Sequence, residues 1–377
     1  MPETDIETDI IVIGGGMVGS AAGYGLVRRG QKVVVLDGGD LDYRAARGNG
    51  GLVWVQGKGL DMPAYQHLTR RSSDLWPDFA RDLMELDQSD IHYQRKGGVT
   101  ICLGEEELAE REGTLMRLHN QPDGTARDFE MVDRRGLEKL LDGIALGEEV
   151  SGASYCWRDG HVDPLRLLLA MQRSFRKLGG TLAAEQPVRS LALKDGLFEA
   201  ATDEGTCRAG KVLIAAGNGS GPLARQIGLD VPVRPQRGQM LVTERFPAML
   251  PLPAGAVRQT ADGTFQIGAT KEEVGFDIST TVDAAAQMAR RAVRVFPFLK
   301  DAKLVRQWAA LRVMTPDGHP IYAQSESHPG AFVALCHSGV TLAAVHAEML
   351  ASAVAAGGFP DEISPFHHRR FDVPKAA

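Results

Sequence analysis

Short apolar runs that end at glycine residues dominate the beginning of the chain. Residues 9–13 (DIIVI) and 32–37 (KVVVLD) have the pattern of buried parallel strands, and residues 17–29 between them are rich in small side chains. The intervening stretch predicts a helix that ends at Gly30. A strand, a helix and a second strand within about thirty residues form a βαβ unit, in which the two strands are parallel. We therefore expect a parallel sheet covered by helices.

Patterns of buried strands and of helices return later in the chain, on either side of two regions whose hydrophobic runs are different. Asp163 and Pro164 predict the start of a helix, because an acceptor side chain is followed by proline at the first helical position. Residues 211–216 predict another buried strand, and the alanine-rich residues 340–356 predict a helix. The two differing regions carry shorter β-like runs near Tyr93 and at 99–103, 239–244 and 265–270, and a predicted helix at 282–295.

These patterns predict two domains, each assembled from separate pieces of the chain. Residues 1–85, 151–231 and 307–377 are expected to form a Rossmann-like domain, with helices covering a parallel sheet. Residues 86–150 and 232–306 are expected to form an α+β domain with a mixed or antiparallel sheet. The predicted fold class is therefore α/β with a second, α+β domain.

Composition and charge exclude several classes of function. The 377 residues carry 42 Lys and Arg against 48 Asp and Glu, a formal net charge of −6. That balance argues against nucleic acid as a partner, because phosphate binding needs a clustered positive surface. No apolar window of about eighteen residues predicts a membrane span, and the acidic N-terminus does not resemble a secretory signal, which favours the cytoplasm. The four cysteines and ten histidines show no spacing typical of disulfides or of a metal site.

A glycine-rich turn directly follows the first predicted strand. Residues 14–19 read G-G-G-M-V-G and match the pattern G-x-G-x-x-G. In this pattern Gly14 allows the tight turn, Gly16 lets the backbone approach a pyrophosphate, and Gly19 permits close packing of helix on strand. The helix N-terminus attracts phosphate, and Asp37 at the end of the second strand is placed to accept hydrogen bonds from ribose hydroxyls. A dinucleotide is expected here, and the acid favours FAD or NAD over NADP.

Further motifs are distributed over nearly the whole chain. They read RAARGNGG at 44–51, AAGNGS at 215–220, PVRPQRGQ at 232–239, IGAT at 267–270 and WAALRVMTPDG at 308–318. Together with the glycine-rich turn, they resemble the FAD-dependent D-amino-acid oxidase superfamily and, within it, the glycine oxidase-like branch, although Ala310 replaces the usual glycine. Residues 51–59 and 336–339 are similar to the flavin subunits of opine oxidases and hydrogen cyanide synthase, and to hydroxyproline dehydrogenases and iminodiacetate oxidase.

The resemblance implies that FAD binds along the Rossmann-like domain and that the second domain binds the substrate. It assigns cofactor contacts to the residues that match the family's motifs. These are Gly14, Gly16, Met17, Val18, Asp37, Gly38, Arg44, Ala45, Arg47, Asn49, Gly50, Gly51, Leu52, Val188, Ala216, Gly217, Arg312, Ser338, Gly339, Val340 and Thr341. The His and Cys to which some relatives attach flavin are missing from residues 45–51 and 311–315. FAD is therefore expected to be non-covalent and to be released intact by denaturation.

The resemblance also implies a reaction and the residues that serve it. A hydride passes from the C–H bond beside nitrogen to the flavin, and the resulting imine hydrolyses. The substrate is then an amino acid or an N-substituted amino acid, such as glycine, iminodiacetate, an opine or hydroxyproline. Arg312 is expected to grip the substrate's carboxylate, since guanidinium pairs bidentately with it. Trp54 and Gln56 are expected to line the pocket, and His337 to contact flavin or substrate.

Other features leave alternatives open. Lys271 stands near the position of an oxygen-activating lysine in sarcosine oxidase-like relatives, and Arg258 offers a site for a second carboxylate if the substrate is dicarboxylic. The electron acceptor is O2 or, if the chain is a dehydrogenase subunit of a heteromeric complex, a partner subunit. An oligomer is compatible with the sequence. The remaining alternatives are a flavoprotein that relays electrons without turnover and an NAD-binding dehydrogenase.

Overall fold

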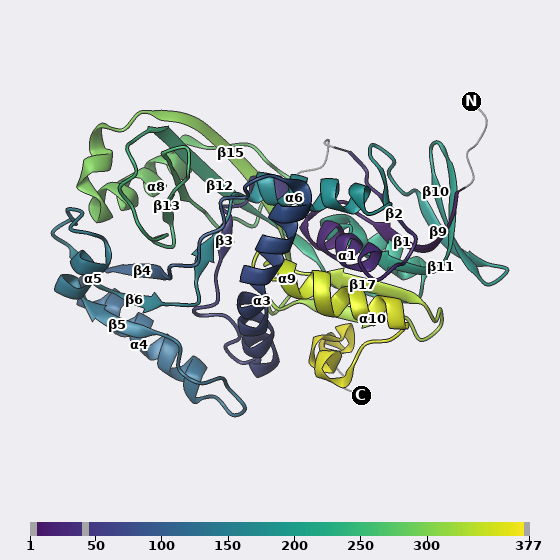
Figure 1. Ribbon diagram of the computed structural model, residues 1–377. Helices are drawn as coiled ribbons and strands as arrows, with labels where there is room; N and C mark the ends of the chain where they lie inside the picture. Colours follow the sequence, from purple (N-terminus) through teal and green to yellow (C-terminus); the bar gives the residue numbers. More distant parts are fainter. Residues whose placement is uncertain (1–5, 40–44, 373–377) are drawn as a thin grey trace.

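The computed structural model describes residues 6–39 and 45–372 and confirms the α/β fold (Figure 1). Its central sheet has eight strands in the order β16-β17-β11-β1-β2-β8, and β10 and β9 continue from β11. Strands β17, β11, β1, β2 and β8 form parallel pairs, whereas β16, β10 and β9 pair antiparallel. The strands are β1 (Ile6–Ile13), β2 (Val33–Leu36), β8 (Thr181–Ala183), β9 (Ser190–Lys194), β10 (Leu197–Thr202), β11 (Gly205–Ile214), β16 (Ile321–Gln324) and β17 (Ala331–Leu335).

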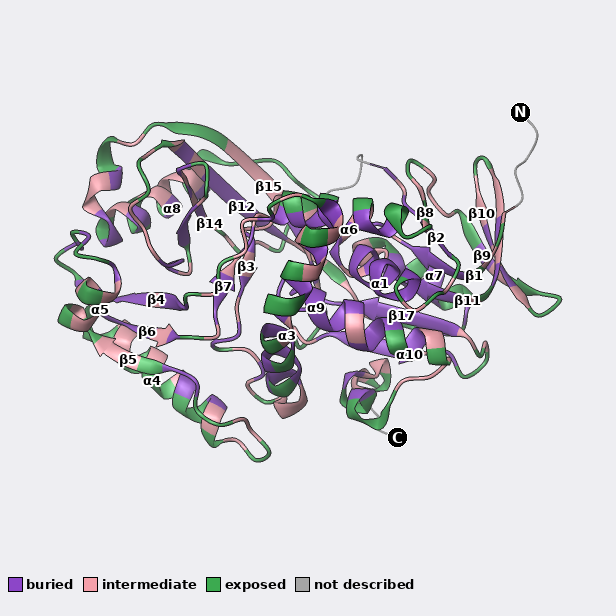
Figure 2. Cartoon of the chain, in the orientation of Figure 1, coloured by how far each residue is buried: buried purple, intermediate pink, exposed green. Residues whose placement is uncertain are grey.

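Alternate residues of the central strands enter two separate hydrophobic cores. Ile10 and Val12 of β1 pack into the core on one face of the sheet, whereas Ile11 and Ile13 pack into the core on the other face. Because side chains alternate along a strand and both faces are covered here, Ile10–Ile13 of β1 are all buried (Figure 2), whereas the first half of the strand is partly exposed. This double burial explains why the strand has a continuous apolar run instead of an alternating pattern.

Helices from distant parts of the chain cover this sheet. The first core contains side chains of α1, α3, α6, α9 and α10, and the second contains side chains of α7. The helices are α1 (Met17–Val27), α2 (Ala45–Gly48), α3 (Pro63–Asp87), α6 (Pro164–Lys177), α7 (Ser220–Gln226), α9 (Ala343–Val345) and α10 (Ala351–Ala356), with single-turn or short helices η1 (Gly217–Gly219), η3 (His346–Leu350), η4 (Asp361–Phe366) and η5 (His368–Phe371). None of the helices within 6–39 and 45–372 is long and apolar enough to cross a membrane.

The other half of the molecule contains two antiparallel sheets that share a third hydrophobic core (Figure 1). One sheet has the order β13-β14-β12-β15 and the other the order β4-β6-β5. Their elements are β4 (Gly98–Leu103), α4 (Gly104–Asn120), β5 (Glu130–Asp133), α5 (Arg134–Leu140), β6 (Val150–Cys156), β12 (Arg234–Arg245), β13 (Val257–Gln259), β14 (Thr264–Gly268), α8 (Val282–Val295), η2 (Pro297–Asp301) and β15 (Leu304–Met314). A short pair, β3 (Leu52–Val53) and β7 (Gly160–His161), completes the strands of the described residues.

The predicted division into two domains stays a prediction. The third core supports the grouping of residues 86–150 with residues 232–306. Side chains of 99–153 and of 241–299 pack together in that core. Two strands lie across or beyond the predicted boundaries. Strand β6 pairs with β4 and β5 although all of it except Val150 lies after the predicted boundary at 150, and β15 crosses the boundary between 306 and 307.

Most of the local expectations hold. The Asp163 side chain caps α6 by accepting hydrogen bonds from the backbone N–H groups of Leu165 and Arg166, both at 3.0 Å, and α8 has the predicted bounds. The C-terminal helical segment begins at Ala343, later than predicted, and a π-helical turn interrupts it. The strand predicted near Tyr93 is wrong, since that stretch forms only an isolated bridge through Gln94.

Candidate active site

A cavity of about 860 Å³ lies where the carboxyl ends of the central strands meet the sheet that contains β12 and β15. Its lining includes the ends of β1, β2 and β11 and the start of α1. In open α/β sheets this edge is where ligands bind, and cavities of about 300–1,000 Å³ are typical of small-molecule sites. The cavity is therefore the candidate active site.

The glycine-rich turn forms one wall of the cavity, and each of its glycines meets a different constraint. Gly14 has φ +106°, and a Cβ there would lie 2.5 Å from the Ala215 carbonyl oxygen. A Cβ at Gly19 would lie 1.9 Å from the Gly14 oxygen, so only glycine lets α1 pack this closely on the turn. A Cβ at Gly16 would meet only Ala46, at 3.8 Å. The space beside Gly16 is thus left open to a ligand.

Asp37 directly follows β2 and is buried beside the turn. Its carboxylate accepts hydrogen bonds from the backbone N–H groups of Gly15, at 2.6 Å, and Gly39, at 3.1 Å. Asp37, Gly38 and Val188 line the same end of the cavity. An acid at the end of the second strand is the geometry that a ribose hydroxyl requires.

Nearly all of the predicted cofactor residues line this cavity. The structure brings together Gly14, Gly16, Met17, Val18, Asp37, Gly38, Ala45, Asn49, Gly50, Gly51, Leu52, Val188, Ala216, Gly217, Arg312, Ser338, Gly339, Val340 and Thr341. Arg47 lies on α2 but not in the lining, and Arg44 lies outside the described residues. Contact of each residue with FAD stays a prediction, and their common cavity supports it.

Arg312 on β15 lines the cavity, as do Trp54 and His337. Its Nη1 donates hydrogen bonds to the carbonyl oxygens of Thr270, at 2.9 Å, and Arg237, at 3.4 Å. Burial lowers the pKa of Arg312, but guanidinium keeps its charge at neutral pH. No carboxylate of the described residues forms an ion pair with it. It is a fixed cation that faces a cavity.

Arg258 on β13 is a second guanidinium in the lining and is 5% exposed. Its Nε and Nη2 donate to Gln266 Oε1, at 3.2 and 2.9 Å, and its Nη1 lies 3.2 Å from His161 Nδ1. Both acceptors are uncharged. Gln266 is an amide, and His161 is neutral because burial and the nearby Arg258 lower its pKa to about 3. One N–H on each Nη nitrogen remains available. In the described residues Arg258 has no ion-pair partner, and burial lowers its pKa to about 10.

A third cation of the cavity, Lys58, was not anticipated from the sequence. It follows β3, and its Nζ donates a hydrogen bond to Ser338 Oγ at 2.5 Å. The same oxygen accepts from the Tyr65 hydroxyl at 2.7 Å and lies 3.1 Å from His337 Nε2. Burial, Lys58 and Arg312 lower the pKa of His337 to about 3, so His337 is neutral. The sequence shows a lysine two residues after Gln56, but whether its side chain points into the cavity depends on the fold.

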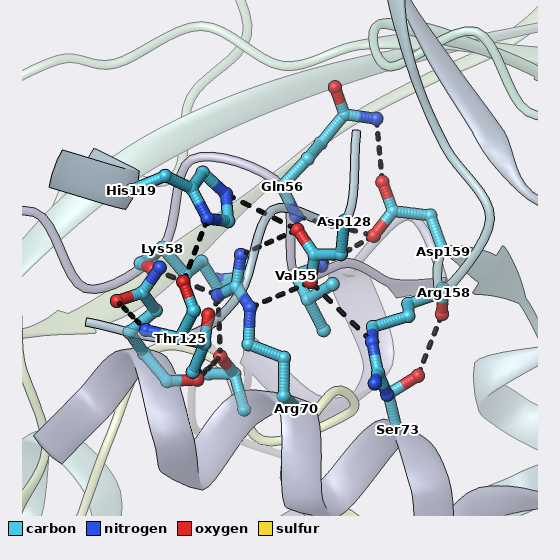
Figure 3. A network of polar contacts seen from close by, with 12 residues as sticks. Val55, Gln56, Lys58, Arg70, Ser73, His119, Thr125, Asp128, Arg158 and Asp159 are labelled. Carbon is cyan, nitrogen blue, oxygen red and sulfur yellow. Dashed lines mark hydrogen bonds and ion pairs between the residues drawn. The ribbon is translucent and has the colours of Figure 1, made fainter. Parts of the chain in front are cut away.

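Besides Arg47, two further predicted site residues lie outside the cavity lining. Gln56 was expected to line the pocket, but its amide is held in a buried polar network. Its Nε2 donates to Asp159 Oδ2 at 2.6 Å (Figure 3). Its Oε1 accepts hydrogen bonds from Arg111 and Ser154, both at 2.6 Å. Its hydrogen-bonding groups are thereby used within the protein. Lys271 is an exposed residue just beyond β14 and does not line the cavity. The structure offers no support for its predicted role with oxygen.

The fold and the cavity together are typical of a dinucleotide-binding protein, with cations among the residues of the cavity lining. Comparison with known proteins gives its family. The chain matches the FAD dependent oxidoreductase family over residues 9–353. It is 41% identical to an opine oxidase subunit of Agrobacterium tumefaciens (strain Ach5), with 98% of this chain and 99% of that protein covered. It is 26% identical to the hydrogen cyanide synthase subunit HcnC of Pseudomonas aeruginosa, with 98% and 97% covered.

A solved structure shows the same fold. Glycine oxidase from Geobacillus kaustophilus superposes with a TM-score of 0.87 at 23% identity, covering 97% of this chain and 99% of that chain. The chain belongs to the FAD-dependent oxidoreductase family. It is accordingly an enzyme, and its cofactor is FAD, which the open approach at Gly16 and the buried acid Asp37 fit.

Gly16 gives a direct test of the cofactor site. Its φ of −76° and ψ of −166° suit alanine, and the added methyl group would meet only Ala46. We expect Gly16→Ala to keep its thermal stability without FAD but to bind FAD more weakly by about tenfold or more, because the methyl group occupies the path of the pyrophosphate. Gly210→Ala, whose Cβ meets nothing within 4 Å, is the control. FAD affinity unchanged in Gly16→Ala would place the pyrophosphate elsewhere.

Proposed function

We propose that this enzyme oxidises the C–N bond of a secondary amine that carries two carboxylates, an opine-like N-(carboxyalkyl) amino acid. One observation carries the proposal: Arg258 and Arg312 line one cavity, and neither has an ion-pair partner in the described residues. A buried cation without a partner is costly, so such groups are normally matched by an anion. Two separate guanidinium groups match two carboxylates. The identity of 41% to a subunit of an opine oxidase supports this substrate class.

The chain's own residues bind and orient the substrate. Arg312 and Arg258 hold one carboxylate each, which fixes the position of the carbon between them and the direction of its C–H bond. When bound, FAD supplies the acceptor for the hydride. Hydrolysis of the resulting imine by water gives a 2-oxo acid and a primary amine, so each substrate loses two electrons and its C–N bond breaks.

The charges of the cavity favour the reactive form of the amine. Lys58, Arg258 and Arg312 are its cations, and Asp37 at the dinucleotide end is the one carboxylate in the described lining. The substrate's carboxylates neutralise the two arginines, so Lys58 is the cation that remains, and positive charge near a bound amine lowers the pKa of that amine. The neutral amine, whose nitrogen lone pair assists the departure of hydride, is therefore favoured. The lining needs no dedicated base for this effect.

An anaerobic screen tests the proposal. The FAD-loaded chain is mixed with N-(1-carboxyethyl) amino acids, iminodiacetate, glycine, sarcosine and hydroxyproline, and loss of the flavin absorbance is followed. Dicarboxylated secondary amines should reduce the flavin at concentrations at least about tenfold lower than the monocarboxylic compounds. Preference for a monocarboxylic amine would contradict the proposal.

We also propose that the chain acts as the flavin subunit of a larger complex, because two of its relatives are named as subunits. Such a subunit passes its electrons to a partner. The reduced chain by itself is then expected to react faster with a redox dye than with O2, measured as dye bleaching against hydrogen peroxide release. Rapid peroxide formation by the isolated chain would favour an oxidase.

A further inference from the structure

Lys58 lines the cavity, and hydrogen bonds hold its backbone in place. Arg70 Nη1 donates to the Lys58 carbonyl oxygen at 3.2 Å, and Arg70 is itself fixed by a buried ion pair with Asp128, Nε to Oδ2, at 2.8 Å (Figure 3). The backbone N–H of Lys58 donates to the Val55 carbonyl oxygen, and the N–H of Val55 donates to Asp159 at 2.6 Å. The backbone of this lysine is thus held by a buried polar network on both sides. A surface lysine has no such support.

The groups around the Lys58 ammonium are neutral or distant. Its Nζ donates to Ser338 and lies 5.9 Å from the centre of the Tyr65 ring. Tyr65, Cys336, His337 and His319 face this region; burial raises the pKa of Cys336 to about 12, raises that of Tyr65 and lowers that of both histidines, so none carries a charge at neutral pH.

Acids do not neutralise this ammonium. Within residues 6–39 and 45–372, no carboxylate lies within ion-pair distance of Lys58 Nζ. Asp159 attracts it only from further away, and burial raises the pKa of Asp159 to about 7. Asp61 is close enough to affect His319, but it forms no ion pair with Lys58. Burial lowers the pKa of Lys58 to about 8, against opposing attraction from Cys336 and Asp159. The cation therefore lacks a permanent counter-charge.

We propose that Lys58 stabilises the negative charge that the flavin carries once it is reduced, acting with Ser338 at the cavity wall. A flavin that accepts a hydride gains two electrons and one proton, so it carries one additional negative charge. Under the proposed function, Arg258 and Arg312 bind the substrate's two carboxylates. Lys58 is then the cation of the described lining that remains to balance the negative charge of the reduced flavin ring. Ser338 links Lys58 to the segment 338–341, which lines the cavity. The inference rests on FAD as the cofactor, and the match of the two other cations to carboxylates rests on the proposed function.

Sulfite is the probe that tests this inference without a substrate. Sulfite adds to oxidised flavin and leaves a negative charge on the ring, so its dissociation constant reports the stabilisation of that charge. Lys58→Met in the FAD-loaded chain should weaken sulfite binding by about tenfold or more, about 1.4 kcal/mol, and should make the two-electron midpoint potential more negative. Lys58→Arg should recover most of the loss, and the exposed Lys32→Met should equal the wild type.

The pH dependence gives a second readout. The wild type should lose sulfite affinity relative to Lys58→Met as the pH rises through about 8, where Lys58 releases its proton. Sulfite binding and potential unchanged in Lys58→Met would overturn the inference, as would a loss that Lys58→Arg fails to restore, which would indicate packing. If Lys58→Met does not retain FAD, Lys58→Gln is measured in the same way. None of these outcomes depends on the amine screen, so the two proposals fail separately.

Discussion

Replacing Arg312 by leucine is expected to abolish flavin reduction by amine substrates while FAD stays bound. Arg312 is a half-buried cation of the cavity lining that a hydrogen bond to the Thr270 carbonyl oxygen holds in place, and its loss leaves the substrate's carboxylate without a partner. Truncating one member of a buried, hydrogen-bonded charge pair costs about 2–5 kcal/mol, so the dissociation constant of the substrate should rise by about 30-fold to several thousandfold. Rapid anaerobic mixing with a dicarboxylated amine measures both this constant and the reduction rate.

The exposed Arg306, on the same strand β15, provides the matched control for Arg312. Arg306→Leu should reduce at the wild-type rate. Arg312→Lys should recover only part of the affinity, because an ammonium does not pair bidentately. Wild-type affinity in Arg312→Leu would show that the carboxylate binds elsewhere. Loss of FAD from this variant would instead make Arg312 a cofactor residue.

Replacing Arg258 by methionine should remove the preference for two carboxylates. The dissociation constant of an N-(1-carboxyethyl) amino acid should rise by about 100-fold, and that of a monocarboxylic amine such as sarcosine should change less than about threefold. Methionine keeps much of the volume of the side chain beside Gln266 and His161, so packing changes little. The measurement is the concentration dependence of flavin reduction for both substrates.

Arg245→Met is the control for Arg258, since Arg245 is an exposed residue at the end of β12 in the same sheet. It should leave both dissociation constants unchanged. An equal loss for both substrates in Arg258→Met would contradict a second carboxylate site and would indicate that Arg258 acts on the flavin or on the fold.

The parts of the fold that follow from local signals were predictable from the sequence. Strand β2 and residues Ile10–Ile13 of β1 are buried on both faces and therefore form continuous apolar runs, and the turn between β1 and α1 requires glycine at positions where any Cβ would collide. The Asp163 cap is likewise a contact with the next few residues. These features depend on neighbouring residues, so they are visible in a short stretch of sequence.

Contacts between distant segments were not predictable in the same way. Helix α3 was missed because its buried face includes polar residues, among them Arg70, whose partner Asp128 lies 58 positions away. Gln56 was misplaced and Lys58 overlooked for a related reason. The direction of each side chain is set by the network around Asp159, and the residues of that network are separated by about a hundred positions in the chain. Hydrophobic periodicity and short motifs do not predict contacts between residues so far apart in the sequence.

A single-turnover experiment tests the central claim most directly, that this FAD enzyme cleaves the C–N bond of a dicarboxylated secondary amine. The yellow, FAD-loaded chain is mixed without oxygen with one equivalent of an N-(1-carboxyethyl) amino acid, and both the absorbance and the products are measured. We expect the flavin to bleach completely and to release one equivalent each of a 2-oxo acid and a primary amine. Flavin that stays yellow with every such amine, while glycine or sarcosine bleaches it, would contradict the account.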